Sequence, residues 1–353
     1  MQKKLVLAAA VAGVLAAPTA FAQSTFYGHL DVGVQRVDPG EGYNGSDLFL
    51  NDQQGSGGSF VGWRATDDLG GGMKGLAVVE VGFFTDTGNF DNNVAIPAVP
   101  AGGSAATTSS LQFAQRQVYV GLEAGFGTVT AGRQYREIFL VGSGGAYNYT
   151  AAGIGVFFQN PNTGVRQSNF IKYASPSMGG LNIVAGYGLG EGTTAATEDN
   201  RYTELGVKYG AGPLRVGAVL GQDKAAGVDL DLMLVGGQFS FGPTTVYAIF
   251  STADNSGTID EQTISLGAKQ NLGSGDVVVQ VAQRSVDTAT NADSTLIGVG
   301  YYHRLSKATT AYVSYGMLKN DDGAQGNAPR QAVATTAAGE DPSTLSFGLR
   351  RTF

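Results

Sequence analysis

Residues 25–36 read Thr-Phe-Tyr-Gly-His-Leu-Asp-Val-Gly-Val-Gln-Arg, and this stretch shows the pattern that decides the fold. Its aliphatic and phenyl side chains fall on even-numbered positions: Phe26, Leu30, Val32 and Val34. The odd-numbered positions carry groups with polar atoms: Tyr27, His29, Asp31 and Gln35. Successive side chains of a β-strand point to opposite faces, so the alternation predicts a strand with one apolar and one polar face.

The same alternation recurs along the chain in segments of roughly ten residues, which are separated by clusters of Gly, Asn, Asp and Ser. Sixteen segments show it: 25–36, 59–67, 73–85, 112–123, 127–134, 165–174, 181–189, 202–209, 214–222, 228–241, 244–252, 258–270, 276–286, 293–305, 309–320 and 343–353. Alternation by itself also fits a soluble β-sandwich, in which the apolar faces pack against each other inside the protein.

Three features favour a closed transmembrane barrel over a sandwich. Short turns such as 69–72 alternate with long loops such as 86–110 and 135–163, as in barrels with short periplasmic and long outer connections. The chain ends on Phe353, in a last segment with an apolar face. Aromatic residues lie near segment ends, where lipid meets water: Tyr27, Trp63, Tyr119, Tyr173, Tyr187, Tyr209, Tyr301, Tyr302, Tyr315, Phe347 and Phe353.

The sequence therefore predicts an all-β fold, a closed antiparallel transmembrane β-barrel of sixteen strands. The even number brings both termini of the chain to the periplasmic side, and a barrel of this size leaves room for water. Closure also pairs every backbone polar group, which a lipid environment requires because it offers no hydrogen bonds.

The first 22 residues are expected to be a secretory signal peptide, followed by one barrel domain over residues 23–353. Lys3 and Lys4 precede an apolar run, and Ala20-Phe21-Ala22 forms a small-residue cleavage site. A transmembrane helix is the alternative, but the run is short for a span of ~20 residues and no charged cluster follows it.

The composition excludes several classes of protein. No later apolar run is long enough for a helix that crosses a membrane, and 54 Gly with 15 Tyr suit strands and turns better than helices. The absence of Cys removes thiol chemistry and Cys-based metal sites. The formal charge is −7, or −9 without Lys3 and Lys4, so nucleic acid is not an expected partner.

Enzymatic chemistry is not expected, although some outer-membrane barrels are proteases or phospholipases. Such chemistry needs a His as general base beside Asp or Ser. The two histidines, His29 and His303, lie on the first and fourteenth predicted strands. The chain has neither a Gly-x-Ser-x-Gly motif nor a Gly-rich phosphate loop that opens a helix.

Four segments resemble motifs of the Gram-negative general diffusion porins, in that family's order and across nearly all of the chain from Thr25 to Phe353. They are residues 62–72 (Gly-Trp-Arg-Ala-Thr-Asp-Asp-Leu-Gly-Gly-Gly), 126–134 (Phe-Gly-Thr-Val-Thr-Ala-Gly-Arg-Gln), 166–176 (Arg-Gln-Ser-Asn-Phe-Ile-Lys-Tyr-Ala-Ser-Pro) and 348–353 (Gly-Leu-Arg-Arg-Thr-Phe). The resemblance implies a homotrimer of sixteen-strand barrels. It also implies that loop three (135–163) folds into the bore as a constriction and that loop two (86–110) reaches a neighbouring subunit.

The family places a ladder of basic side chains on the pore wall opposite acidic side chains of loop three. Matching the motifs puts Arg116, Arg133 and Arg166 on this ladder, and puts His29 where some relatives carry Lys. The alternative is that these are solvated lumen residues away from the narrowest point.

The first ladder position departs from the family pattern. Phe60 stands where the family often has an Arg, and Arg64, on the same face of its strand, is expected to replace it in part.

Loop three also departs from the pattern, since it lacks the family's Pro-Glu-Phe-Gly-Gly element. Its only carboxylate is Glu137, which Arg136 is expected to balance. The rest of the loop is rich in small and aromatic residues; Tyr147 and Tyr149 either pack the folded loop or form a surface on which sugars stack. Because the wall arginines then lack opposing carboxylates, a weak anion preference is predicted. Charges on distant loops are screened beyond a Debye length of about 8 Å.

The function predicted from the sequence is a general diffusion porin of the outer membrane, which passes small hydrophilic solutes and ions and needs no cofactor or metal. One alternative is a substrate-selective porin that uses the aromatic loop three as a binding slide. Another is a structural or adhesive barrel with a closed bore. The expected partners are further copies of the chain in a homotrimer, outer-membrane lipid and lipopolysaccharide, and the solutes themselves.

Overall fold

The computed structural model describes residues 23–45, 47–51, 58–90, 114–145, 164–190, 201–225, 228–255, 257–287, 289–326 and 335–353. The expected signal peptide, residues 1–22, lies outside the described residues. Seventeen strands and one helix, α2 (Glu137–Gly145), are found in the described part of the chain. None of its helices is long and apolar enough to cross a membrane.

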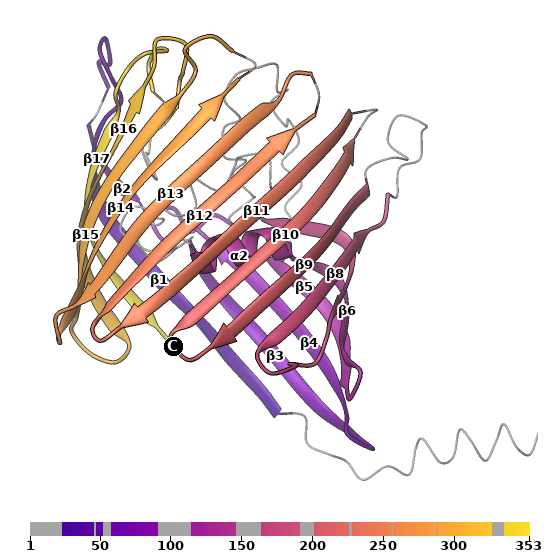
Figure 1. The fold of residues 1–353 in the computed structure, drawn as a ribbon. Coiled ribbons are helices and arrows are strands. Elements are labelled where there is room, and N and C mark those ends of the chain that lie inside the picture. The colour runs from indigo at the N-terminus through magenta and orange to yellow at the C-terminus, as the bar shows by residue number, and fades with distance from the viewer. Residues whose placement is uncertain are drawn as a thin grey trace, which may run out of the picture.

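Sixteen of the strands form one closed antiparallel barrel, and the seventeenth, β2, is a short additional strand (Figure 1). The strands are β1 (Gln23–Asp38), β2 (Leu48–Asn51), β3 (Ser59–Gly70), β4 (Met73–Phe83), β5 (Gln117–Ala124), β6 (Gly127–Tyr135), β7 (Arg166–Ala174), β8 (Leu181–Gly188), β9 (Arg201–Ala211), β10 (Leu214–Ala225), β11 (Val228–Phe241), β12 (Thr244–Asp254), β13 (Asp260–Asn271), β14 (Gly275–Val286), β15 (Ser294–Arg304), β16 (Thr309–Asn320) and β17 (Ser343–Thr352).

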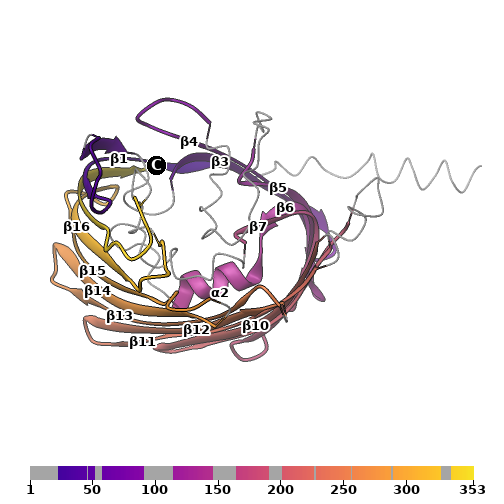
Figure 2. The ribbon, with the colours of Figure 1, turned by 90° about the horizontal axis from the view of Figure 1, so that it is seen from above.

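Each barrel strand pairs with its neighbour in sequence, and β1 closes the ring against β17. The register runs from His29 opposite Thr352 to Asp38 opposite Ser343. On its other edge β1 pairs first with β3 and then, toward the loop end, with the short strand β2. Viewed along the bore, the strands form a ring (Figure 2). This confirms the predicted sixteen-strand antiparallel barrel.

The barrel turns its apolar faces outward and its polar faces inward. Leu30 is 42% exposed and Val279 is 46% exposed, whereas their sequence neighbours Asp31 and Gln280 are 1% and 3% exposed. A soluble protein buries its large apolar side chains, so this inverted pattern fits a surface that meets lipid.

Some aromatic residues expected at the lipid boundary face the lumen instead. The hydroxyl of Tyr27 donates a hydrogen bond to Glu80, and Tyr302 stacks on Tyr312, whose hydroxyl donates to the buried Asp31. Their positions belong to the polar parity of their strands, so this prediction was wrong for Tyr27 and Tyr302. It was also wrong for Tyr119, which lies between the exposed Val118 and Val120 on β5 and faces inward.

The predicted segments match the barrel strands to within a few residues at most ends. Two elements were missed: β2, which lies in the connection between the first two predicted segments, and α2, which lies within the predicted loop three. Strand β5, which corresponds to the fourth predicted segment, begins later than predicted, at Gln117 instead of 112.

Helix α2 lies inside the ring of strands, against the wall formed by β9 to β12 (Figure 2). Its buried face, Ile138 and Val141, joins an apolar cluster with wall residues that point inward. The other members of this cluster are Phe170, Tyr202, Val219, Leu232, Leu234, Ile249 and Ala253. The remainder of loop three, residues 146–163, lies outside the described residues, so the inward fold of the loop as a whole stays a prediction.

Candidate functional site

Three arginines gather where β5, β6 and β7 lie side by side. Arg116 immediately precedes β5, Arg133 belongs to β6, and Arg166 is the first residue of β7. The hydroxyl oxygen of Tyr135 accepts a hydrogen bond from Nη2 of Arg116 at 2.9 Å and from Nη2 of Arg166 at 3.0 Å. The guanidinium of Arg166 also lies 4.6 Å from the centre of the Tyr135 ring. One tyrosine thus holds two of the predicted ladder arginines together.

Arg133 is fixed by neutral groups. Its Nε donates to the backbone oxygen of Gln115 at 2.6 Å, and its Nη1 donates to Oγ of Ser168 at 2.8 Å. Neither Arg133 nor Arg166 forms an ion pair with any residue that the structure describes. Their charges are therefore oriented by hydrogen bonds, and no described carboxylate lies within ion-pair distance of them.

Arg116 differs, because Glu80 of β4 lies beside it. Nε of Arg116 is 3.6 Å from Oε2 of Glu80, and the other carboxylate oxygen accepts a hydrogen bond from Tyr27 at 2.8 Å. The sequence-based expectation that the wall arginines largely lack opposing carboxylates was wrong for Arg116. Glu80 comes from a neighbouring strand, and no spacing in the sequence links it to Arg116.

The first strands place His29 and Arg64 near this cluster. The ring of Phe60 supports the guanidinium of Arg116 at 4.4 Å and meets the His29 ring edge-on, with 4.8 Å between the ring centres. Arg64 lies over the ring of Tyr27 at 5.3 Å and is exposed. Phe60, which stands where the resemblance leads one to expect an Arg, therefore supports Arg116.

Arg136 does not pair with Glu137 as the sequence suggested. Its Nη2 donates to Oδ2 of Asp223 on β10 at 2.8 Å and to Oε1 of Gln167 at 2.6 Å. Its guanidinium lies 3.8 Å from the centre of the Tyr202 ring. Arg136 thus fastens the end of β6, just before α2, to the wall formed by β9 and β10.

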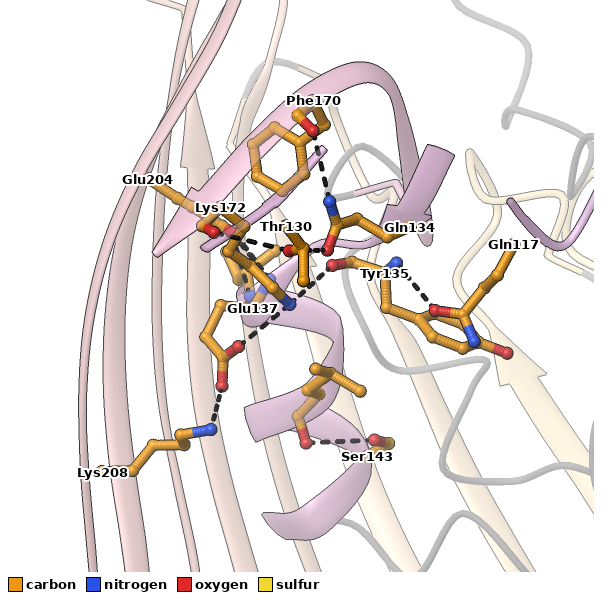
Figure 3. Close-up of polar contacts among 12 residues, drawn as sticks. Gln117, Thr130, Gln134, Tyr135, Glu137, Ser143, Phe170, Lys172, Glu204 and Lys208 are labelled. Atoms are coloured by element: carbon orange, nitrogen blue, oxygen red, sulfur yellow. Dashed lines mark hydrogen bonds and ion pairs between the residues drawn. The ribbon is translucent and has the colours of Figure 1, made fainter. Parts of the chain in front are cut away.

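Glu137 points to the wall and pairs with two lysines (Figure 3). Its carboxylate lies 3.4 Å from Nζ of Lys172 on β7 and 2.7 Å from Nζ of Lys208 on β9. The single carboxylate predicted in loop three is therefore paired with lysines of β7 and β9. It does not oppose Arg116, Arg133 or Arg166.

The carboxylate of Glu204 on β9 caps the N-terminus of α2. It accepts hydrogen bonds from the backbone N–H of Glu137, at 2.8 Å to each oxygen, and from that of Ile138 at 3.3 Å. The hydroxyl of Tyr202 donates to the same carboxylate at 2.9 Å. A carboxylate here satisfies otherwise unpaired N–H groups and complements the positive end of the helix dipole.

The aromatic residues of loop three are only partly described. Phe139, the third residue of α2, stacks on Tyr135 with 5.0 Å between the ring centres. Tyr147 and Tyr149 lie outside the described residues, so their predicted place at the constriction stays a prediction.

Among the residues that are described, no group of three or more His, Asp or Glu could hold a metal ion.

The sequence identified the arginines but missed the residues that position them and α2: Glu80, Tyr135, Asp223 and Glu204. Glu204 and Lys208 could have been found from their strand, because both lie on the polar parity of the segment 202–209. Their contact with α2 follows only from the closure of the barrel.

A closed barrel with apolar strand faces outside and oriented charged groups inside has the architecture of an outer-membrane channel. The profile of the family described as Gram-negative porin matches residues 7–323, and the chain belongs to this family. These proteins are non-enzymatic channels, which confirms the expectation that the chain is not an enzyme.

Relatives of known sequence cover the chain in full or in part. The chain is 30% identical to outer membrane porin protein 32 of Delftia acidovorans, in an alignment 377 positions long that covers 99% of this chain and 100% of the relative. It is 29% identical to an outer membrane porin protein of Bordetella pertussis over 61% of this chain and 58% of that one.

Solved structures show the same architecture. The anion-selective porin from Comamonas acidovorans aligns with a TM-score of 0.79 and 28% identity, over 94% of this chain and 100% of that one. The trimer form of OmpT from Vibrio cholerae aligns with a TM-score of 0.67 at 18% identity, over 94% and 99%, and supports the fold alone. The chain is an outer-membrane porin, as the sequence predicted.

Proposed function

We propose that this porin is a general diffusion channel for small hydrophilic solutes and ions, with a weak preference for anions. The observation that carries the proposal is the arginine cluster, in which Arg133 and Arg166 have no ion-pair partner in the described part of the chain. The carboxylates near α2 are already committed, Glu137 to two lysines and Asp223 to Arg136. The anion selectivity named for the Comamonas porin agrees with this assignment.

Planar-bilayer recording of the purified protein in a potassium chloride gradient tests the proposal. The sign of the reversal potential should show that anions permeate more readily than cations, and flux should fall smoothly as solutes become larger. A reversal potential of the opposite sign contradicts the anion preference. Saturable block by one solute that Tyr147→Ala or Tyr149→Ala relieves favours the substrate-selective alternative, and an absence of conductance favours a closed structural barrel.

We also propose that the channel is a homotrimer that sits among lipid and lipopolysaccharide. The exposed apolar faces of the strands provide a surface for lipid, and one porin of the same fold, OmpT, is described in a trimer form. Conductance that closes in three equal steps is expected. Dissociation to single barrels in mild detergent, with one step per insertion, contradicts the trimer.

Export is proposed to use the N-terminal residues as a cleaved signal peptide. The charged start, apolar run and Ala20-Phe21-Ala22 support cleavage after Ala22. Mass spectrometry of the protein purified from outer membranes should give an N-terminus at Gln23. An N-terminus that retains Lys3 and Lys4 contradicts this proposal.

A further inference from the structure

A pocket of about 450 Å³ lies between helix α2 and the inner wall of the barrel. Leu140 and Val141 of α2 line one side, and residues of β8 to β11 line the other. Ser177 and Gly180, from the connection between β7 and β8, lie at its margin. The pocket is therefore on the side of α2 that is nearer to the short turns, and it shares no residue with the arginine cluster.

The wall of the pocket consists of two rows of residues in register. Asn182, Lys208, Gly217 and Gly236 lie opposite one another from β8 to β11. The next row toward the turns is Gly210, Arg215 and Gln238. The glycines leave the wall without side chains, and α2 approaches closely: a Cβ on Gly217 would lie 2.9 Å from the Cγ atoms of Val141.

The charged groups of the pocket are both cationic. Arg215 is exposed and forms no ion pair with the residues described in this structure. Lys208 shares the carboxylate of Glu137 with Lys172, so two ammonium groups face one carboxylate (Figure 3). No carboxylate lines the pocket among the described residues, and the amides of Asn182 and Gln238 add neutral hydrogen-bonding groups.

We propose that this pocket binds a small organic anion that has a carboxylate at one end and an apolar body. The carboxylate pairs with Arg215, whose planar guanidinium suits two-point contact with such a group, and with Lys208. The apolar body packs against Leu140, which is 37% exposed and loses contact with water when it binds. The inference rests on the proposed anion-passing function and adds a second anion-binding site in the bore, separate from the arginine cluster.

Block of the channel by benzoate tests the pocket, because benzoate has one carboxylate and an apolar ring. The measured quantity is the benzoate concentration that halves the potassium chloride current through the reconstituted full-length protein. Arg215→Gln should raise that concentration about tenfold, the loss of one charged hydrogen-bonded contact. Leu140→Ser should raise it about threefold for benzoate and leave block by inorganic phosphate, which has no apolar body, unchanged.

Lys269→Gln is the matched control. Lys269 lies opposite the inward-facing Thr245 at the same end of the barrel, on β13, and does not line the pocket. It should leave benzoate block unchanged. Equal shifts in Arg215→Gln and Lys269→Gln would mean that only the general potential of the lumen attracts benzoate, and would overturn the pocket.

The failures of the two proposals are distinguishable. A wild-type channel that prefers cations contradicts the proposed function itself. A wild-type channel that prefers anions but shows no block by benzoate, or whose block is unchanged by Arg215→Gln, overturns the pocket alone. Each variant is first checked for folding by the change in gel migration between the unheated and the heated protein, so that a shift in block reports on binding.

Discussion

Arg116 and Arg166 donate to the same hydroxyl oxygen, that of Tyr135, yet only Arg116 has a described carboxylate beside it. This difference gives a prediction for ion selectivity. Removing a charge that no carboxylate offsets should change the pore potential more than removing one half of an ion pair. Arg166→Gln should lower the ratio of anion to cation permeability about two- to threefold, as expected for loss of one charge at several ångströms in water. Arg116→Gln should lower it less.

Glu80→Gln provides the opposite change at the same place. It removes the carboxylate that offsets Arg116 and keeps an oxygen that can accept the Tyr27 hydrogen bond. The anion preference should therefore rise. Reversal potentials of the three variants, Arg166→Gln, Arg116→Gln and Glu80→Gln, measured in one salt gradient, rank their anion preferences. If Arg116→Gln and Arg166→Gln shift the potential equally, the pairing with Glu80 has no influence on selectivity.

Helix α2 depends on the wall more than on its own sequence. Three of its nine residues are Gly, and its apolar run Ile138-Phe139-Leu140-Val141 suits a strand as well as a helix. Short helices are marginal alone and gain most of their stability from tertiary contacts. Here those contacts are the apolar cluster around Ile138 and Val141 and the capping carboxylate of Glu204.

Glu204→Gln should loosen the first turn of α2 without unfolding the barrel. The side-chain amide replaces one acceptor oxygen with a donor, which then faces the N–H groups of Glu137 and Ile138. Losing a helix N-cap costs about 1 kcal/mol, so hydrogen exchange at these two amides should become roughly five- to tenfold faster.

Glu261→Gln is the control for that measurement. Glu261 is another buried, inward-facing carboxylate, and it pairs with Arg284 across β13 and β14. It should leave exchange in α2 unchanged. Unchanged exchange in Glu204→Gln as well would show that the apolar cluster alone holds the helix.

The sequence predicts those elements whose interactions join residues close together in the chain. The barrel strands were predicted because alternation is a property of consecutive residues, such as Leu30 and Asp31. Helix α2 was missed because its cap, Glu204, comes from a strand far along the chain. The arginines were found through motifs, whereas Glu80 and Asp223 became partners only when the barrel closed.

At the scale of the whole molecule, the barrel separates two environments by a single residue step. Val279 on β14 is exposed on the outer surface, and the next residue, Gln280, donates a hydrogen bond to Ser265 inside. All sixteen barrel strands belong to one closed sheet, so an insertion of one residue in any strand would reverse its faces. The alternation in every barrel strand thus specifies the same bore, whereas the ion selectivity of the bore depends on a few side chains.

Val279→Arg tests whether the outer face meets lipid. An arginine on the lipid face near the bilayer midplane costs about 2–4 kcal/mol, whereas on a surface in water it costs almost nothing. Val279→Ala, the control, loses only apolar contact, about 1 kcal/mol. The free energy of unfolding from lipid vesicles, measured by urea titration, should therefore fall clearly more for Arg than for Ala. If Arg is tolerated as well as Ala, the face of β14 that carries Val279 lies against water or a protein neighbour, and the assignment of the outer surface to lipid fails at this strand.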